Sequence, residues 1–172
     1  MIRDARPADF AVIAALNKAS EQFVSPMSEA RLAQLHGWAA YHRVTEAAGE
    51  VAAFLIAFRE GARYDSPNYR WFSERYASFV YIDRVIVDAA QRGKGLATAL
   101  YQDVFTFARQ QGVASVTCEF DVEPPNEVSR RFHVRFGFHE VGRHAYNRKR
   151  VSMQATSVAA APTADSSSVP RR

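Results

Sequence analysis

The chain has 172 residues, one cysteine, a net charge of +4 and 48% hydrophobic residues. This length predicts one domain with its own core, and a single cysteine excludes a disulfide framework and a cysteine-based zinc site. The positive charge is spread along the sequence, so we do not expect nucleic acid as a partner. No run approaches the ~20 apolar residues that cross a bilayer, and the N-terminus has no apolar signal region. We therefore expect a cytoplasmic protein with no membrane association.

The first sixty residues predict a strand, two helices and a β-hairpin. Pro7 suits the first turn of a helix, and Ser28 begins a segment that resembles a capped helix start. The apolar residues that follow each of them have helical spacing. Gly49 lies in the predicted hairpin turn. The predicted strands are residues 2–6, 41–45 and 51–59.

Residues 61–78 are long for a connection between strands and are rich in aromatic side chains. One interpretation is a short helix with a small core of its own. The other is a wall of a ligand site, because loops on a rigid scaffold often carry specificity. The two interpretations are compatible. Tyr64 and Trp71 are candidates for cation–π contacts with an amine, and packing is the alternative for both.

Residues 81–100 predict a buried strand, a glycine loop and an amphipathic helix. Val85, Ile86 and Val87 are contiguous and β-branched, as in a strand buried on both faces. The loop has two glycines and two cations, so its backbone turns tightly and approaches a ligand closely. Because the next helix points unpaired N–H groups at the loop, the segment predicts a phosphate site. The loop residues are Arg92, Gly93, Lys94 and Gly95.

Three types of phosphate loop compete for this segment. The P-loop needs Ser or Thr after its lysine, whereas Lys94 is followed by Gly95. The dinucleotide fingerprint needs a third Gly or Ala, and the chain has Thr98 there. The third type is the acyl-CoA loop of the GNAT acetyltransferases, with the pattern Arg/Gln-x-x-Gly-x-Gly/Ala. The run Arg92-Gly-Lys-Gly95-Leu96-Ala97 resembles it at each fixed position.

A second motif follows at the family's own distance. Residues 113–120 predict another strand, and residues 126–138 then read Asn-Glu-Val-Ser-Arg-Arg-Phe-His-Val-Arg-Phe-Gly-Phe. This run resembles the GNAT pattern Asn-x-x-Ala-x-x-Leu-Tyr-x-x-x-Gly-Phe. Two motifs in the right order identify the chain as a member of the GNAT acyltransferases over residues 1–150.

The helix between the two motifs spans residues 93–111, with Gly112 as its C-cap. Its predicted buried stripe is Leu96, Leu100, Val104 and Phe107. Residues 138–151 supply the last strands. We place the GNAT domain at residues 1–151. Residues 152–172 are rich in Ala, Ser, Thr and Pro, so we expect a disordered tail that buries too little apolar surface to offset its ordering entropy.

The resemblance implies an α/β fold, with a mixed, mostly antiparallel sheet of six to seven strands flanked by about four helices. It also implies direct acetyl transfer from acetyl-CoA to a primary amine of a small molecule or peptide, without metal, in a protein that forms a homodimer. The backbone from Arg92 to Ala97 would hold the pyrophosphate. The backbone of Val85, Ile86 and Val87 would meet the thioester carbonyl, and Asn126 would contact the pantetheine arm. Asn126 is alternatively a helix N-cap alone.

Three side chains compete for proton transfer. Glu119 resembles the base of the ribosomal-protein N-acetyltransferase branch, and its alternative is a surface carboxylate or an ion pair with an arginine. Asp83 lies near the place of the catalytic Glu in other branches, and its alternative is a pair with Arg84 or a structural hydrogen bond. His133 replaces the family's proton-donating Tyr. A histidine titrates near neutrality, so it donates to the leaving thiolate or else is a packed helix residue.

Two other function classes remain open from the sequence. One is an acyl-CoA-binding protein without transferase activity, which would keep the loop and lack acid–base groups. The replacement of the family's Tyr by His133 favours this class, and the presence of Glu119 argues against it. A nucleotide-binding oxidoreductase fragment is disfavoured by the missing third small residue and the lack of a second βαβ unit. Cys118 is expected in the core, with no covalent acyl role.

Overall fold

The computed structural model describes residues 1–146 and 149–160. In this part of the chain seven strands form one mixed sheet, in the order β1-β2-β3-β4-β5-β7-β6, with five α-helices around it. The predicted α/β class and strand number are confirmed, and α3 adds a fifth helix to the four expected. The strands are β1 (Ile2–Asp4), β2 (Tyr41–Ala47), β3 (Glu50–Arg59), β4 (Phe79–Val87), β5 (Ser115–Glu123), β6 (His139–Tyr146) and β7 (Lys149–Ser157). The helices are α1 (Phe10–Lys18), α2 (Glu29–Trp38), α3 (Pro67–Ser73), α4 (Leu96–Gln110) and α5 (Glu127–Arg135).

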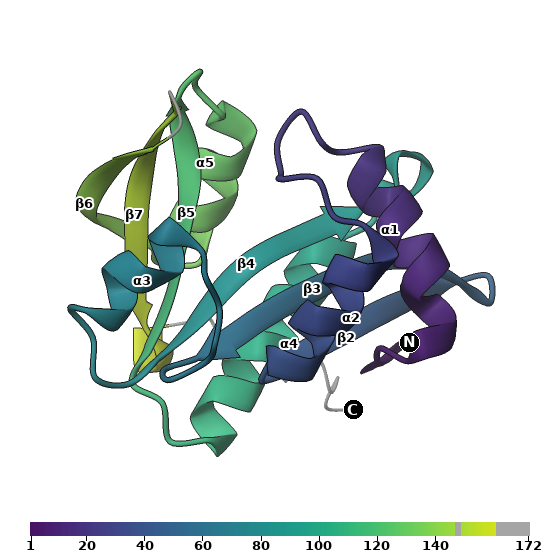
Figure 1. The fold of residues 1–172 in the computed structure, drawn as a ribbon, viewed down its shortest axis with the longest axis horizontal. Helices are drawn as coiled ribbons and strands as arrows, with labels where there is room; N and C mark the ends of the chain where they lie inside the picture. The colour runs from purple at the N-terminus through teal and green to yellow at the C-terminus, as the bar shows by residue number, and fades with distance from the viewer. Residues whose placement is uncertain (147–148, 161–172) are drawn as a thin grey trace, which may run out of the picture.

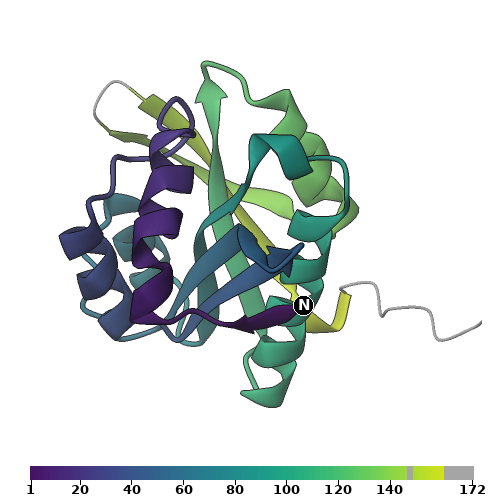
Figure 2. The same cartoon turned by 90° about the vertical axis from the view of Figure 1, so that its right-hand side faces the viewer.

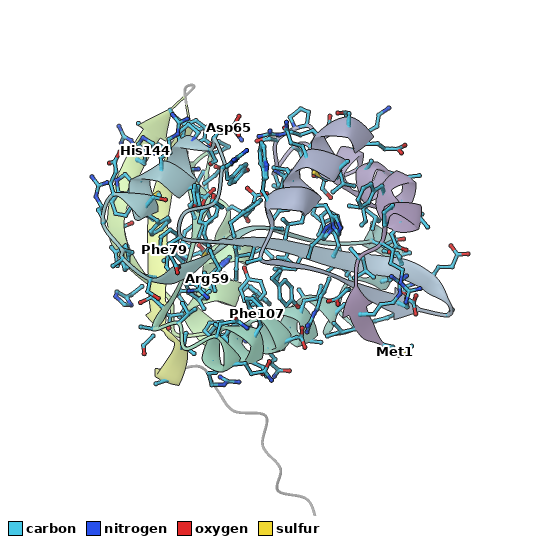
Figure 3. The ribbon with its side chains drawn as sticks, turned by 60° about the horizontal axis from the view of Figure 1, so that its bottom comes forward. Met1, Arg59, Asp65, Phe79, Phe107 and His144 are labelled. Carbon is cyan, nitrogen blue, oxygen red and sulfur yellow. The ribbon has the colours of Figure 1, made fainter. Side chains whose placement is uncertain are left out.

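The sheet separates two hydrophobic cores. Helices α1, α2 and α3 cover one face, and the first core includes Leu32, Phe54 and Phe72. Helices α4 and α5 lie on the other face, where the second core includes Leu100 and Val116. Figure 2 shows α1 and α2 on one side of the sheet and α4 and α5 on the other. In Figure 3, Phe107 marks the α4 side.

Strands β4 and β5 pair over a short length only. They are parallel, and Phe79, Val80 and Tyr81 pair with Ser115, Val116 and Thr117. Beyond these residues the two strands diverge, as Figure 1 shows between the β1–β4 half and the β5–β7 half of the sheet. Backbone and side chains of both strands therefore face the gap between them.

A β-bulge in β4 lies at the start of this gap. The register with β3 shifts between the pairs Ile56–Arg84 and Ala57–Ile82, so Asp83 is the extra residue. A one-residue shift moves later side chains to the opposite face. Tyr81 and Ile86 consequently both face the α1–α3 core. In a regular strand, two residues five positions apart would face opposite sides of the sheet.

Helix α4 differs from its prediction at its start and in its buried stripe. It begins at Leu96 because Gly95, the N-cap, has φ +76°, a left-handed conformation that does not continue a helix. The buried residues are Leu100, Tyr101, Val104, Phe105 and Ala108, whereas Leu96 and Phe107 are only partly buried. The stripe is thus wider than predicted, and α4 packs it against β2, β3, β4 and β5.

The predicted tail boundary at residue 152 is wrong. Strand β7 continues to Ser157, and a 3-10 turn covers Val158–Ala160. β7 pairs with β5 on one edge and with β6 on the other, so its polar residues are buried inside the sheet. Ser152 donates to Glu140, and Gln154 donates to Ser152 at 2.6 Å. These contacts replace the large apolar side chains whose absence suggested disorder. Residues 161–172 lie outside the described residues.

In the described residues no helix is long and apolar enough to span a membrane.

Candidate active site

A cleft of about 200 Å³ opens where β4 and β5 separate. The loop between α1 and α2 lies at one side of it, with Phe23 at the rim, and helix α5 lies at the other. All three predicted acid–base residues line the cleft, so the structure brings together side chains from separate parts of the sequence. They are Asp83, Glu119 and His133.

Glu119 lies on β5 just beyond the residues that pair with β4, and its side chain lines the cleft. Its Oε1 accepts hydrogen bonds from the Tyr81 hydroxyl and the Asn68 amide, both at 2.9 Å. Its Oε2 is closed to solvent and has no hydrogen-bond partner among the described residues. Burial raises the pKa of Glu119 to about 8, and the two hydrogen bonds to Oε1 oppose this shift. An unpaired carboxylate with a pKa near neutrality suits proton transfer.

The partners of Glu119 are themselves fixed by packing. Asn68 lies buried in α3, and its Oδ1 is 3.1 Å from His144 Nδ1 on β6. Tyr81 is buried on β4 beneath α3. Figure 3 shows His144 near the end of the molecule where Asp65 precedes α3. Helix α3 and strands β4 and β6 thus hold the Glu119 carboxylate in one orientation.

Both oxygens of Asp83 are engaged. Oδ1 accepts from the Tyr64 hydroxyl, and Oδ2 forms an ion pair with Arg84 Nε at 2.6 Å. Arg84 also donates to Asn17 Oδ1 at 2.7 Å and to the Ser25 carbonyl at 3.1 Å. The ion pair is the alternative that the sequence left open for Asp83. The Arg84 guanidinium, through Asn17 and Ser25, ties β4 to α1 and to the loop that forms one side of the cleft.

The glycine loop lies open beyond the end of β4. Gly93 and Gly95 have φ of +78° and +76°, and a Cβ at either would meet nothing within 4 Å. Arg92 and Lys94 are exposed, and Lys94 donates to Gln91. The first helical hydrogen bond of α4 runs from Ala99 N to the Gly95 carbonyl, so the N–H groups before Ala99 have no acceptor within the helix. The loop therefore offers an uncovered backbone cradle with positive charge, which fits a pyrophosphate.

Only part of the β4 backbone faces the gap. The Asp88 N–H donates to the Ala52 carbonyl on β3, so alternate residues, including Ile86, point their backbone toward β3. Val85 and Val87 point theirs toward the gap left by β5. Val85 also lines the cleft. Ile86 pairs with Phe54, so its backbone is turned toward β3, and contact of the Val85, Ile86 and Val87 backbone with a ligand stays a prediction.

His133 is buried on α5 with both ring nitrogens engaged. Nδ1 is 2.7 Å from the Ser129 carbonyl and 3.2 Å from the Ser129 hydroxyl. Nε2 is 2.8 Å from the Tyr101 hydroxyl of α4. Burial lowers the pKa of His133 to about 4, so the ring is neutral near pH 7. Asn126 also lines the cleft, and its side chain caps α5 by accepting from Ser129 N.

The residues of segment 61–78 divide between the two interpretations. Helix α3 packs Phe72 and Tyr69 into the core, while Tyr64 and Ser66 line the cleft. Trp71 does not line it: its ring packs beside Gly142 and under the Arg75 guanidinium, 4.1 Å from the ring centroid. Trp71 is thus a packing residue.

Four residues contribute to the site and were not predicted to do so: Tyr101 and Tyr146 line the cleft, and Tyr81 and Asn68 donate to Glu119. Tyr81 and Tyr101 carry no motif signal, because both stand where a buried apolar residue would fit the pattern equally well. Their hydroxyls reach Glu119 and His133 across 38 and 32 residues of sequence.

Cys118, as expected, is buried in the α4-side core, and burial raises the pKa of its thiol.

The sequence matches the model of the acetyltransferase (GNAT) family over residues 10–138, three quarters of the chain. The chain belongs to this family. A search of curated protein sequences finds no match.

Among solved structures, Ard1 from Thermoplasma volcanium superimposes with a TM-score of 0.74 at 20% identity, covering 91% of this chain and 96% of that one. The ribosomal-protein-S18-alanine N-acetyltransferase from Escherichia coli gives 0.71 at 16% identity, covering 98% of both chains. The yncA protein of Salmonella typhimurium, solved with its cofactor acetyl-CoA, gives 0.68 at 20% identity, covering 99% and 97%. At these identities the likeness shows that the GNAT fold is shared.

Proposed function

We propose that this GNAT protein transfers the acetyl group of acetyl-CoA directly to a primary amine. The observation that carries the proposal is the Glu119 carboxylate, which lies in the gap between β4 and β5 with Oε2 unpaired and a pKa raised to about 8. Membership of the acetyltransferase family supports acetyl-CoA as the donor. The acceptor is the amine of a small molecule or a peptide.

Glu119 acts as the base in this proposal. An amine is protonated at neutral pH and attacks only when its nitrogen carries a lone pair. Glu119 Oε2 accepts the proton of the amine, while Tyr81 and Asn68 hold Oε1 in place. General base catalysis of this kind contributes about 10²- to 10⁴-fold to a rate.

The donor is held by backbone rather than by side chains. The open loop from Arg92 to Ala97 and the N-terminus of α4 bind the pyrophosphate, and Arg92 and Lys94 add charge. Acetyl-CoA supplies the activated thioester. The Val85 N–H, on the unpaired edge of β4, donates to the carbonyl oxygen as negative charge develops there.

The two substrates enter from opposite faces of the sheet. Tyr101 and His133 line the cleft from the α4–α5 face, and Tyr64 and Glu119 line it from the face that α3 covers. Both substrates therefore reach the gap together, which supports a ternary complex. Cys118 also lines the cleft, but direct transfer needs no acyl-cysteine, and burial raises the pKa of its thiol and so disfavours the nucleophilic thiolate.

The test is a screen of acetyl-CoA with small amines, amino acids and peptides, read by mass spectrometry of the acetylated product. We expect wild-type protein to acetylate at least one class, and Glu119→Gln to lower kcat at least about 100-fold. Glu123→Gln is the matched control, since Glu123 is exposed on the same strand and pairs with Arg150. Tight acetyl-CoA binding without turnover on any amine would instead support the acyl-CoA-binding protein. A cytoplasmic location and a homodimer stay predictions.

A further inference from the structure

His133 has no free proton to give at neutral pH. The Ser129 carbonyl can only accept a hydrogen bond, so its 2.7 Å contact places the ring proton on Nδ1. Nε2 then carries a lone pair, and the Tyr101 hydroxyl donates to it at 2.8 Å. The pKa of His133, lowered to about 4, keeps this state dominant. The side chain at the position of the family's Tyr is thus an acceptor.

The missing hydroxyl comes from a different helix. Tyr101 lies in the second turn of α4, and its side chain crosses to α5 with 1% exposure. Its hydroxyl lies one hydrogen bond beyond the tip of the His133 ring. Tyr101 and His133 both line the cleft, together with Val85 and Cys118. The cleft therefore holds one phenolic O–H on the α4–α5 face, and its direction is set by an imidazole.

We propose that Tyr101 is a catalytic residue that donates a hydrogen bond to the thioester sulfur, and that His133 is the positioning residue that holds its hydroxyl. The proposal rests on the proposed function, because it assumes that acetyl-CoA lies in the gap. The role extends the site beyond the two family motifs, since Tyr101 belongs to neither.

The step balances without a proton leaving Tyr101. The amine nitrogen bonds to the carbonyl carbon, the C–S bond breaks, and its electron pair goes to sulfur. Tyr101 turns its O–H about the C–O bond from His133 Nε2 to the sulfur and stabilises the charge that forms. Glu119 takes the proton of the amine and later returns one to water, and the departing thiolate takes one from water. Burial raises the pKa of Tyr101 well above its usual value, so the phenol stays protonated as a donor.

The pKa of the CoA thiol in its complex with the protein tests the contact directly. The ultraviolet absorbance of the thiolate is titrated with pH, and the desulfo-CoA complex is subtracted. A hydrogen bond from Tyr101 favours the thiolate, so Tyr101→Phe should raise the thiol pKa by about one unit. The same variant should lower kcat about 10- to 100-fold with KM for acetyl-CoA little changed.

Tyr41→Phe is the matched control. The Tyr41 hydroxyl donates to Asp103 of α4 at 2.6 Å, away from the cleft, so its loss should leave the thiol pKa unchanged. His133→Phe should move the thiol pKa in the same direction as Tyr101→Phe, and the double variant should show little further change, because the two act as one unit. CoA binding with a thiol pKa that Tyr101→Phe leaves unaltered would overturn the Tyr101 proposal alone. Failure of wild-type protein to bind CoA would overturn the proposed function as well.

Discussion

At the scale of residues, Glu119 shows how burial and hydrogen bonding act in opposite directions on one carboxyl. Desolvation is the largest influence and raises the pKa to about 8, while Tyr81 and Asn68 lower it by donating to Oε1. At pH 7 most of the protein therefore carries a neutral Glu119, and the ionised fraction grows as the pH approaches 8.

The pH dependence of turnover follows from this pKa. We expect kcat/KM to rise with pH up to about 8 in wild-type protein, because only the ionised Glu119 accepts a proton. The amine titrates as well, so the profile is measured with two acceptors of different amine pKa. An inflection that stays in place for both acceptors and vanishes in Glu119→Gln belongs to the enzyme. An inflection that moves with the acceptor would assign the profile to the amine.

The sequence predicts part of the site at this scale. Asn126 and His133 belong to the second motif, Glu119 resembles the base of one GNAT branch, and all three line the cleft. Asn68 and Tyr81 were not predicted as partners of Glu119, because helix α3 and strand β4 bring them there from 51 and 38 positions away. Such contacts depend on tertiary packing, which no local pattern specifies.

At the scale of elements, the glycine turn before α4 lies where the sequence predicts it. The glycines predicted to allow a tight turn have positive φ, and no side chain covers them. The predicted start of α4 at residue 93 is three residues too early, because Gly95 has a left-handed conformation and belongs to the loop as the N-cap. The predicted last strand ended at residue 151, whereas β7 continues to Ser157. Its Ser, Gln and Thr residues are buried between two strands, but in the sequence alone such polar residues are also typical of a disordered tail.

Gly95→Asp tests the role of this turn. A side chain at φ +76° is strained, and its charge opposes both the pyrophosphate and the helix N-terminus. We expect the variant to weaken acetyl-CoA binding at least about 100-fold by calorimetry. Gly61→Asp makes the same exchange at φ +79°, in the turn after β3, and should bind as wild type does. Unchanged affinity in Gly95→Asp would exclude the loop from donor binding.

At the scale of the whole molecule, three buried groups whose shifted pKa values lie between about 4 and 8 link stability to pH. Burial lowers the pKa of His42 and His133 to about 4, and it raises the pKa of Glu119 to about 8. The unfolded chain binds more protons at the histidines between pH 4 and 6.5, so stability rises with pH in that window. The folded chain binds more protons at Glu119 between pH 4.5 and 8, so stability falls with pH there.

The free energy of unfolding should therefore peak near pH 6.5, where the slope from the two half-titrated histidines equals the opposing slope from Glu119. Urea unfolding between pH 4 and 9 measures this curve. Glu119→Gln should flatten the limb above pH 6.5 and steepen the acid limb between pH 4.5 and 6.5, where Glu119 opposes the two histidines. An alkaline limb that persists in this variant would place the titrating group elsewhere.

The base, the phenolic hydroxyl and the glycine loop act together only if acetyl-CoA binds in the gap between β4 and β5. Isothermal titration of the protein with acetyl-CoA, beside NAD and ATP, measures this most directly. We predict saturable binding of acetyl-CoA, one per chain, with neither nucleotide competing for the site. Selective binding of NAD, or no binding of acetyl-CoA or CoA, would contradict the assignment of the loop and of the chemistry that depends on it.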